Sequence, residues 1–255
     1  MKPSLPALSS LPARLRGLRR STVALASAAA CAVGLLAAPV ASANPGGKDL
    51  VVFGDSFASN PTLPAGHYIA GTAPNSGSRV PVTGSGGCPQ DRENWPRVAA
   101  GILNVLQWID TGTHVAGVAG VLPSGYHATI AEVRRQVQAA APNAEIVMAG
   151  YPELGAGDNV CLINVTPNQP APLMLPGIAA VESGLQSSIR SAADANGIRF
   201  VDMKALTAGH GTCAAPDSQR YVAGIYDQTS DHNMKLHPTL EGSRAMGRIM
   251  ADNLR

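Results

Sequence analysis

Strand-like and helix-like segments alternate along most of this chain, and that alternation constrains the fold more than any other feature. Short apolar runs indicate strands at residues 49–53, 105–109, 113–118, 144–149 and 198–202, and helical spacing indicates helices at 93–103, 128–141, 177–196 and 239–254. Such alternation predicts an α/β fold with a mostly parallel sheet covered on both faces. Because ligands bind outside the carboxyl ends of parallel strands, we expect site residues directly after strands.

The first expected strand runs straight into a Gly54-Asp55-Ser56 turn. Gly54 tolerates a tight bend, and Ser56 is expected to rise out of the sheet edge. Backbone N–H groups beyond the turn are then free to face an anion. An activated serine nucleophile needs this exposure and these donors, because its attack creates an oxyanion. We expect Asp55 to brace the turn by accepting backbone N–H bonds.

A histidine near the far end of the chain is suited to act as the base for Ser56. His237 stands in a Leu-His-Pro triplet just before the helix expected at 239–254. Asp231, six residues earlier, is the candidate acid that orients the imidazole. The alternative is a backbone carbonyl in that role, which would leave a Ser–His dyad. A nucleophile early and a base late indicate a serine hydrolase.

Together these motifs resemble the SGNH (GDSL-type) hydrolase family, and its secreted actinobacterial members in particular. The triplet at 54–56 is similar to the family's nucleophile block, and 236–238 followed by Gly242 is similar to its histidine block. The resemblance implies a three-layer α/β/α sandwich with a flavodoxin-like sheet, and ester hydrolysis through a serine acyl-enzyme. It also implies that the N–H groups of Ser56 and Gly112 form the oxyanion hole.

Two positions depart from the family's pattern. The family usually supplies an asparagine to the oxyanion hole from its third block, and residues 115–120 contain none. Asn75 and Asn159 are conceivable substitutes. The family's aspartate three residues before the histidine is replaced by Met234. Since losing one oxyanion donor costs roughly 100- to 1000-fold in turnover, a slow enzyme and an inactive protein both stay open.

The first 43 residues are typical of an export signal. A basic start without acidic residues precedes an alanine-rich apolar stretch, and Ala41-Ser42-Ala43 fits a cleavage site. The alternative is a membrane anchor, against which Pro39 within the stretch argues. We therefore predict a signal peptide over 1–43 and one hydrolase domain over 44–255. The protein would be secreted or held in the cell envelope, with no stable membrane anchor after cleavage.

Charge and cysteine content restrict the partners. Without the signal, the chain would carry 14 basic and 17 acidic side chains, which gives no electrostatic reason to bind nucleic acid. No spacing fits a metal or organic cofactor, and we expect His210 and His232 to be structural.

Export from the cytoplasm would permit disulfide bonds. We favour Cys161 with Cys213, because both lie in Gly/Pro/Asn-rich loops of the C-terminal half, and this leaves Cys88 unpaired.

The expected activity is hydrolysis of carboxylic esters by a monomer. Ser56 would attack the acyl carbonyl, and His237 would transfer the proton to the leaving alcohol. The resemblance and the export signal imply a small acyl-ester or lipid-like substrate. Two alternatives stay open: transfer of the acyl group to a sugar or cell-envelope acceptor, and a catalytically inactive envelope-binding protein with the same fold.

Overall fold

The computed structural model describes residues 49–54, 56–60, 82–83, 89–90, 93–105, 107–113 and 123–255. The predicted signal peptide, Asp55, Asn75, Cys88 and the part of the expected third strand beyond residue 113 lie outside these ranges. Within them, no helix combines the length and the apolar character needed to cross a membrane.

Two parallel strand pairs form the centre of the fold. β1 (Asp49–Gly54) pairs with β4 (Gln107–Thr113), and β5 (Val147–Ala149) pairs with β8 (Arg199–Val201). Each pair is parallel because at least one helix returns the chain between its two strands. The predicted α/β class with parallel strands is confirmed. The expected strand at 105–109 begins slightly later and continues to Thr113.

Four long helices surround the strands, close to where the apolar spacing predicted them. They are α3 (Trp95–Leu103), α4 (Pro123–Ala140), α5 (Ile178–Ala195) and α7 (Leu240–Asn253).

Residues at the helix ends account for where several of these helices begin and end. The side chain of Asn94 caps α3, and the hydroxyl of Thr239 caps α7 by accepting from the N–H of Gly242 at 2.9 Å. Asn104 and Gly197, both with positive φ, follow the last residues of α3 and α5.

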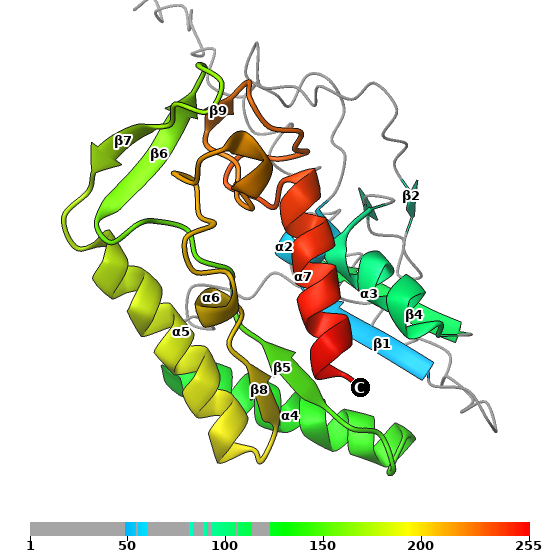
Figure 1. The fold of residues 1–255 in the computed structure, drawn as a ribbon. Helices are drawn as coiled ribbons and strands as arrows, with labels where there is room; N and C mark the ends of the chain where they lie inside the picture. Colours follow the sequence, from blue (N-terminus) through cyan, green and yellow to red (C-terminus); the bar gives the residue numbers. More distant parts are fainter. Residues whose placement is uncertain are drawn as a thin grey trace, which may run out of the picture.

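Helices cover both faces of the β5–β8 pair (Figure 1). Val201 of β8 is buried with Ala99 of α3 and Met246 of α7 in one apolar core. Its neighbour Phe200 faces the other way, where the guanidinium carbon of Arg190 on α5 lies 4.7 Å from the ring centre. α4 packs beside α5. Alternate residues of one strand therefore serve opposite helical layers, as a three-layer sandwich requires.

The segment 151–177, which its prolines and asparagines mark as a loop, contains a hairpin. β6 (Asn159–Asn164) pairs antiparallel with β7 (Ala171–Met174) and parallel with β9 (Tyr226–Asp227). Pro172 lies in β7, which is exposed throughout and has β6 as its neighbour on one side, so the missing N–H of proline costs little. Proline density therefore concealed an edge strand rather than excluding one.

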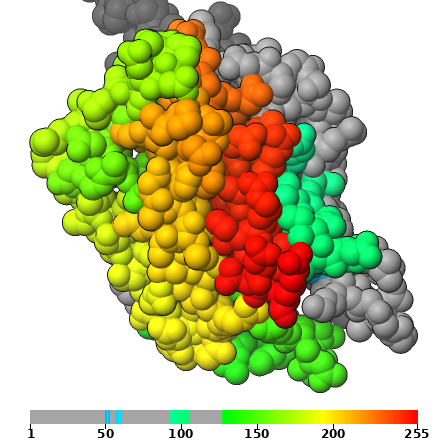
Figure 2. All heavy atoms as spheres, viewed as in Figure 1, coloured from blue at the N-terminus to red at the C-terminus, as the bar shows by residue number. Residues whose placement is uncertain are grey.

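Short elements complete the described part of the chain. They are α2 (Ser56–Ser59), β2 (Val82–Thr83), β3 (Pro89–Gln90), α6 (Met203–Leu206) and a 3₁₀ turn at Asp217–Gln219. Figure 2 shows α7 as a stripe on the molecular surface, between α3 and the segment that follows β8. α7 thus connects the apolar core that contains Met246 to the loops at its own N-terminal end.

The contact between α3 and α7 depends on a glycine. A Cβ at Gly247 would lie 2.5 Å from the Cβ of Val98, whereas a Cβ at Gly184 in α5 would meet nothing within 4 Å. We expect Gly184→Ala to raise the free energy of unfolding by up to about 1 kcal/mol through helix propensity. Gly247→Ala should lower it by about 1–3 kcal/mol, because the helices must separate. Urea unfolding followed by circular dichroism measures both, and equal shifts would contradict this account of the α3–α7 contact.

Candidate active site

The predicted nucleophile is the first residue of a short helix that closely follows a strand. β1 ends at Gly54 and the short helix α2 begins at Ser56. Ser56 therefore follows the carboxyl end of a parallel strand, which is the edge where ligands of such sheets bind.

The predicted oxyanion glycine lies on the neighbouring strand at the same edge. In the β1–β4 register, Gly54 is the partner of Thr113, so Gly112 precedes that partner by one residue. α2 also contacts β4 directly. Gly112 is thus brought close to Gly54 at the end of β1, although the two are far apart in sequence.

The predicted base meets the residue that follows Ser56. The ring of His237 stacks on Phe57 with centroids 4.8 Å apart and planes inclined by 28°. Phe57 also meets the ring of Tyr151 edge to face, with centroids 5.1 Å apart. Tyr151 follows β5 closely. α2, the segment that follows β5 and the loop before α7 therefore contribute to one aromatic cluster around His237.

The imidazole of His237 is oriented by a backbone carbonyl. Its Nδ1 lies 2.8 Å from the carbonyl oxygen of Lys235, two residues earlier. A carbonyl oxygen only accepts, so Nδ1 carries the proton in this contact and Nε2 is the basic nitrogen of the neutral ring. Asp231 lines a depression of about 240 Å³ together with Asp217 and Glu241. A backbone carbonyl, the alternative to Asp231 in the orienting role, thus lies at Nδ1 of His237.

The loop that carries His237 is held in a strained conformation. Leu236 has φ 54°, in the left-handed region that a leucine rarely occupies. The N–H of Leu236 donates to the carbonyl of Gly224 at 3.2 Å, and the carbonyl of His237 accepts from Ala223 at 3.0 Å. Such backbone strain persists where surrounding contacts over-determine the conformation.

One buried residue near the site was missed by sequence reasoning. Asn60 follows α2 and donates its side-chain amide to the carbonyl of Pro238 at 3.0 Å. No motif marks Asn60, because its importance arises from contacts with residues far along the chain. The proposed substitute donor Asn159 lies instead in β6, where its backbone pairs with Ala156.

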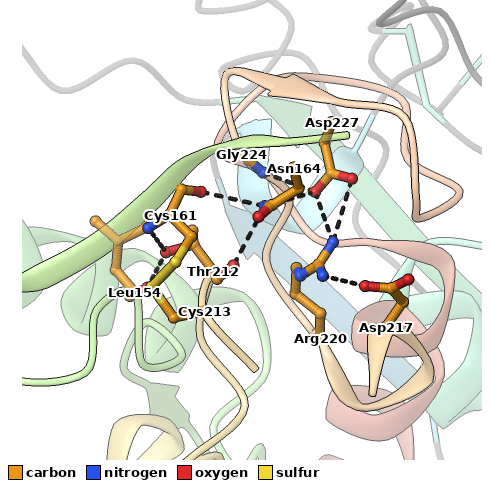
Figure 3. Close-up of a disulfide and its surroundings, with 9 residues drawn as sticks. All are labelled: Leu154, Cys161, Asn164, Thr212, Cys213, Asp217, Arg220, Gly224 and Asp227. Carbon is orange, nitrogen blue, oxygen red and sulfur yellow. Dashed lines mark hydrogen bonds and ion pairs between the residues drawn. A yellow bond between two sulfur atoms is a disulfide. The ribbon is translucent and has the colours of Figure 1, made fainter. Parts of the chain in front are cut away.

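Figure 3 shows a buried ion pair, between Arg220 and Asp227, in the segment to which the His237 loop is hydrogen-bonded. Arg220 and Asp227 are fully buried, and Nη1 of Arg220 lies 3.2 Å from both carboxylate oxygens. Arg220 also pairs with Asp217. Burial raises the pKa of Asp227, but the N–H of Gly224 and the charge of Arg220 outweigh it and hold that pKa below its ordinary value.

The predicted disulfide is present beside this ion pair. Cys161 and Cys213 are bonded, and Asn164 lies between the disulfide and the carboxylate of Asp227 (Figure 3). The amide of Asn164 donates to the carbonyls of Cys161 and Thr212 and to Asp227. The hairpin, the disulfide loop and β9 are therefore joined through one buried network.

Two further histidines, His210 and His232, contact backbone or aromatic groups. His210 stacks on Tyr221 with centroids 4.2 Å apart, and its Nδ1 lies 2.8 Å from the carbonyl of Gln219. His232 is buried with Nδ1 2.9 Å from the carbonyl of Ser230. In the described residues, no group of three or more histidine, cysteine or acidic side chains is arranged to hold a metal ion.

Comparison with known proteins relates this chain to bacterial lipases. Lipase 2 of Streptomyces coelicolor is 27% identical over 123 residues, which are 46% of this chain and 39% of that relative. The match thus spans about two fifths of the relative's length. No protein-family model matches the chain.

One of the similar solved structures supports the fold. The extracellular lipase of Streptomyces rimosus superimposes with a TM-score of 0.51 at 17% identity, covering 81% of this chain and 99% of that one. A putative GDSL-like lipase from Parabacteroides merdae gives a TM-score of 0.45 at 13% identity, covering 81% and 96%. The Streptomyces rimosus structure confirms the predicted fold class, and the resemblance read from the motifs is confirmed at the level of the fold.

The ion pair between Arg220 and Asp227 gives a prediction for stability. Asp227→Asn should lower the free energy of unfolding by about 3 kcal/mol, at the low end for breaking a buried pair, because Asp217 still faces Arg220. The exposed pair of Glu132 and Arg135 supplies the control, and Glu132→Gln should leave the urea midpoint unchanged.

The lowered pKa of Asp227 also predicts a pH dependence. A carboxyl with a lower pKa in the folded state stabilises it above the unfolded value of about 3.8, and this contribution is lost as the pH falls through the folded pKa. Urea unfolding at pH 7 and pH 3 measures this effect. Between these pH values, the free energy of unfolding should fall less for Asp227→Asn than for the wild type. An equal fall in both proteins would contradict a lowered pKa of Asp227.

Proposed function

We propose that this protein is a carboxylic-ester hydrolase in which Ser56 is the nucleophile and His237 is the general base. The observation that carries the proposal is the stacking of His237 on Phe57, the residue next to Ser56. It supports a base held beside the nucleophile at the carboxyl edge of parallel strands. The names of the similar proteins, a lipase of Streptomyces coelicolor and an extracellular lipase of Streptomyces rimosus, support the same reaction class.

The reaction would proceed through an acyl-enzyme. Nε2 of His237 takes the proton of the Ser56 hydroxyl as Oγ attacks the acyl carbonyl, and then gives it to the leaving alcohol. The N–H groups of Ser56 and Gly112 would stabilise the oxyanion, a role supported by the register that brings Gly112 close to Gly54. Water activated by His237 then attacks the acyl-enzyme, and the carboxylic acid is released.

Two contacts of His237 support the Ser–His dyad. The carbonyl of Lys235 fixes the ring orientation and the tautomer. When the ring takes up a proton, the imidazolium lies against the face of Phe57, and such a cation–π contact stabilises charge by about 0.5–2 kcal/mol. A Ser–His dyad can therefore operate without Asp231.

We further infer that the protein acts outside the cytoplasm on a small acyl-ester or lipid-like substrate, as a monomer. The expected signal peptide at 1–43 and single domain at 44–255 support export. The Cys161–Cys213 disulfide supports it independently, since disulfides persist in oxidising compartments.

The nucleophile and base are tested by substitution. Ser56→Ala and His237→Gln should each lower kcat for p-nitrophenyl ester hydrolysis by more than ~10³-fold, because both act in the same step. The chain-length profile of the wild type then separates an esterase from a lipase. A wild type as inert as the two variants would contradict the hydrolase and favour the acyltransferase or the inactive binding protein.

The orienting group is tested at Asp231. Asp231→Asn should leave kcat and the lower pKa of the pH–rate profile nearly unchanged, because Nδ1 of His237 faces the carbonyl of Lys235. In a triad that uses a carboxylate, the corresponding amide lowers kcat by about 10⁴-fold. A loss of that size here would assign the orienting role to Asp231. Asp252→Asn, at the exposed end of α7, is the matched control.

A further inference from the structure

We propose that Asn60 is a positioning residue that fixes the nucleophile helix against the loop carrying the base. The inference rests on the proposed function, because it concerns the same Ser56–His237 pair. Asn60 touches neither substrate nor reacting atoms in this role. Its buried amide sets where α2 stands relative to His237.

The side chain of Asn60 joins α2 to the residue after the base. Asn60 directly follows α2, four residues after Ser56, and only 1% of its surface is exposed. Its Nδ2 lies 3.0 Å from the carbonyl oxygen of Pro238 and 3.2 Å from the hydroxyl of Ser243 in α7. Since a carbonyl only accepts, the amide nitrogen and not the oxygen must face Pro238.

A second amide makes the link reciprocal. Nδ2 of Asn233, which is also fully buried, donates to the backbone carbonyl of Asn60 at 2.7 Å. Asn233 precedes His237 and Pro238 follows it, so the two hydrogen bonds hold the loop on both sides of the base. Buried polar groups without partners are costly, and this cost opposes any separation of α2 from the loop.

The link is made of neutral groups, which suits its position. His237 alternates between neutral and protonated forms during the proposed reaction, and a nearby charged tether would respond to each change. Amide donors and carbonyl acceptors keep their hydrogen bonds in both states. The geometry between α2 and the loop is therefore independent of the protonation of the base.

The backbone of Asn60 allows its two roles to be separated. Its φ of 39° is left-handed, a conformation that asparagine and glycine tolerate better than other residues. Asn60→Gly therefore keeps the turn after α2 and deletes the amide. Asn104, with φ 51° at the exposed end of α3, offers the same substitution away from the site. Asn104→Gly is the matched control.

The test compares both glycine variants with the wild type at a temperature well below each unfolding midpoint. Because a misplacement of about 1 Å can cost roughly 100-fold in rate, Asn60→Gly should lower kcat about 10- to 100-fold while KM stays within about twofold. Inactivation by a small fluorophosphonate, which needs an activated serine, should slow by the same factor. Asn104→Gly should match the wild type in all three constants.

Several outcomes would overturn the inference. They are a kcat of Asn60→Gly equal to that of the wild type, a change in the KM of Asn60→Gly without a change in its kcat, and an equal decrease of kcat in Asn104→Gly. If Asn60→Gly does not fold, Asn60→Asp serves instead, because it keeps the shape and the left-handed turn but turns an oxygen toward the Pro238 carbonyl. A wild type that neither hydrolyses esters nor is modified at Ser56 overturns the proposed function as well. An active wild type with an unaffected Asn60→Asp overturns only the positioning role.

Discussion

The ion pair between Arg220 and Asp227 is the contact on which the C-terminal half of this protein depends. Both side chains are fully buried, so each charge must be neutralised and hydrogen-bonded where it stands. Asp227 satisfies this requirement with donors from the hairpin and from Gly224, and Arg220 with a second carboxylate at Asp217. Elements that would otherwise be separate loops therefore share one structure, and the adjacent disulfide fixes the same region covalently.

Hydrogen bonds to this network fix the backbone of the His237 loop. The backbone carbonyl of Arg220 accepts from the hydroxyl of Thr239, which also caps α7, and Gly224 accepts from the N–H of Leu236. The residues on both sides of His237 are thus tied to the segment between Arg220 and Asp227. This explains how a leucine in a left-handed conformation is sustained next to the base: the surrounding hydrogen bonds outweigh a local cost of roughly 1–2 kcal/mol.

The sequence predicts the parts of this molecule that follow from local pattern. Apolar periodicity located the four long helices, and the strand-to-turn signal located Ser56 at the end of β1. The hairpin at 159–174 was not predicted, because its prolines indicated a loop. Proline is tolerated in an edge strand, and only the pairing of the strands shows which strand is at an edge. Asn60 was not predicted, and a backbone carbonyl was left open as the group that orients His237 without being identified as that of Lys235, for a different reason. Hydrogen bonds between distant segments, and the role of a backbone oxygen, leave no mark in residue identity.

In the proposed Ser–His dyad, a backbone carbonyl orients His237, so the orientation of the ring depends on the geometry of the backbone. A carboxylate attracts an imidazolium over several ångströms, so small displacements of its loop cost little. A carbonyl two residues away orients the ring only if the backbone of 235–237 is fixed. That requirement fits the buried hydrogen bonds between neutral groups found here. The Thr239 hydroxyl donates to the carbonyl of Arg220, the Asn60 amide to the carbonyl of Pro238, and the Asn233 amide to the carbonyl of Asn60. In the proposed dyad, rigidity of the loop would serve in place of the aspartate that the related family carries three residues before its histidine, where this chain has Met234.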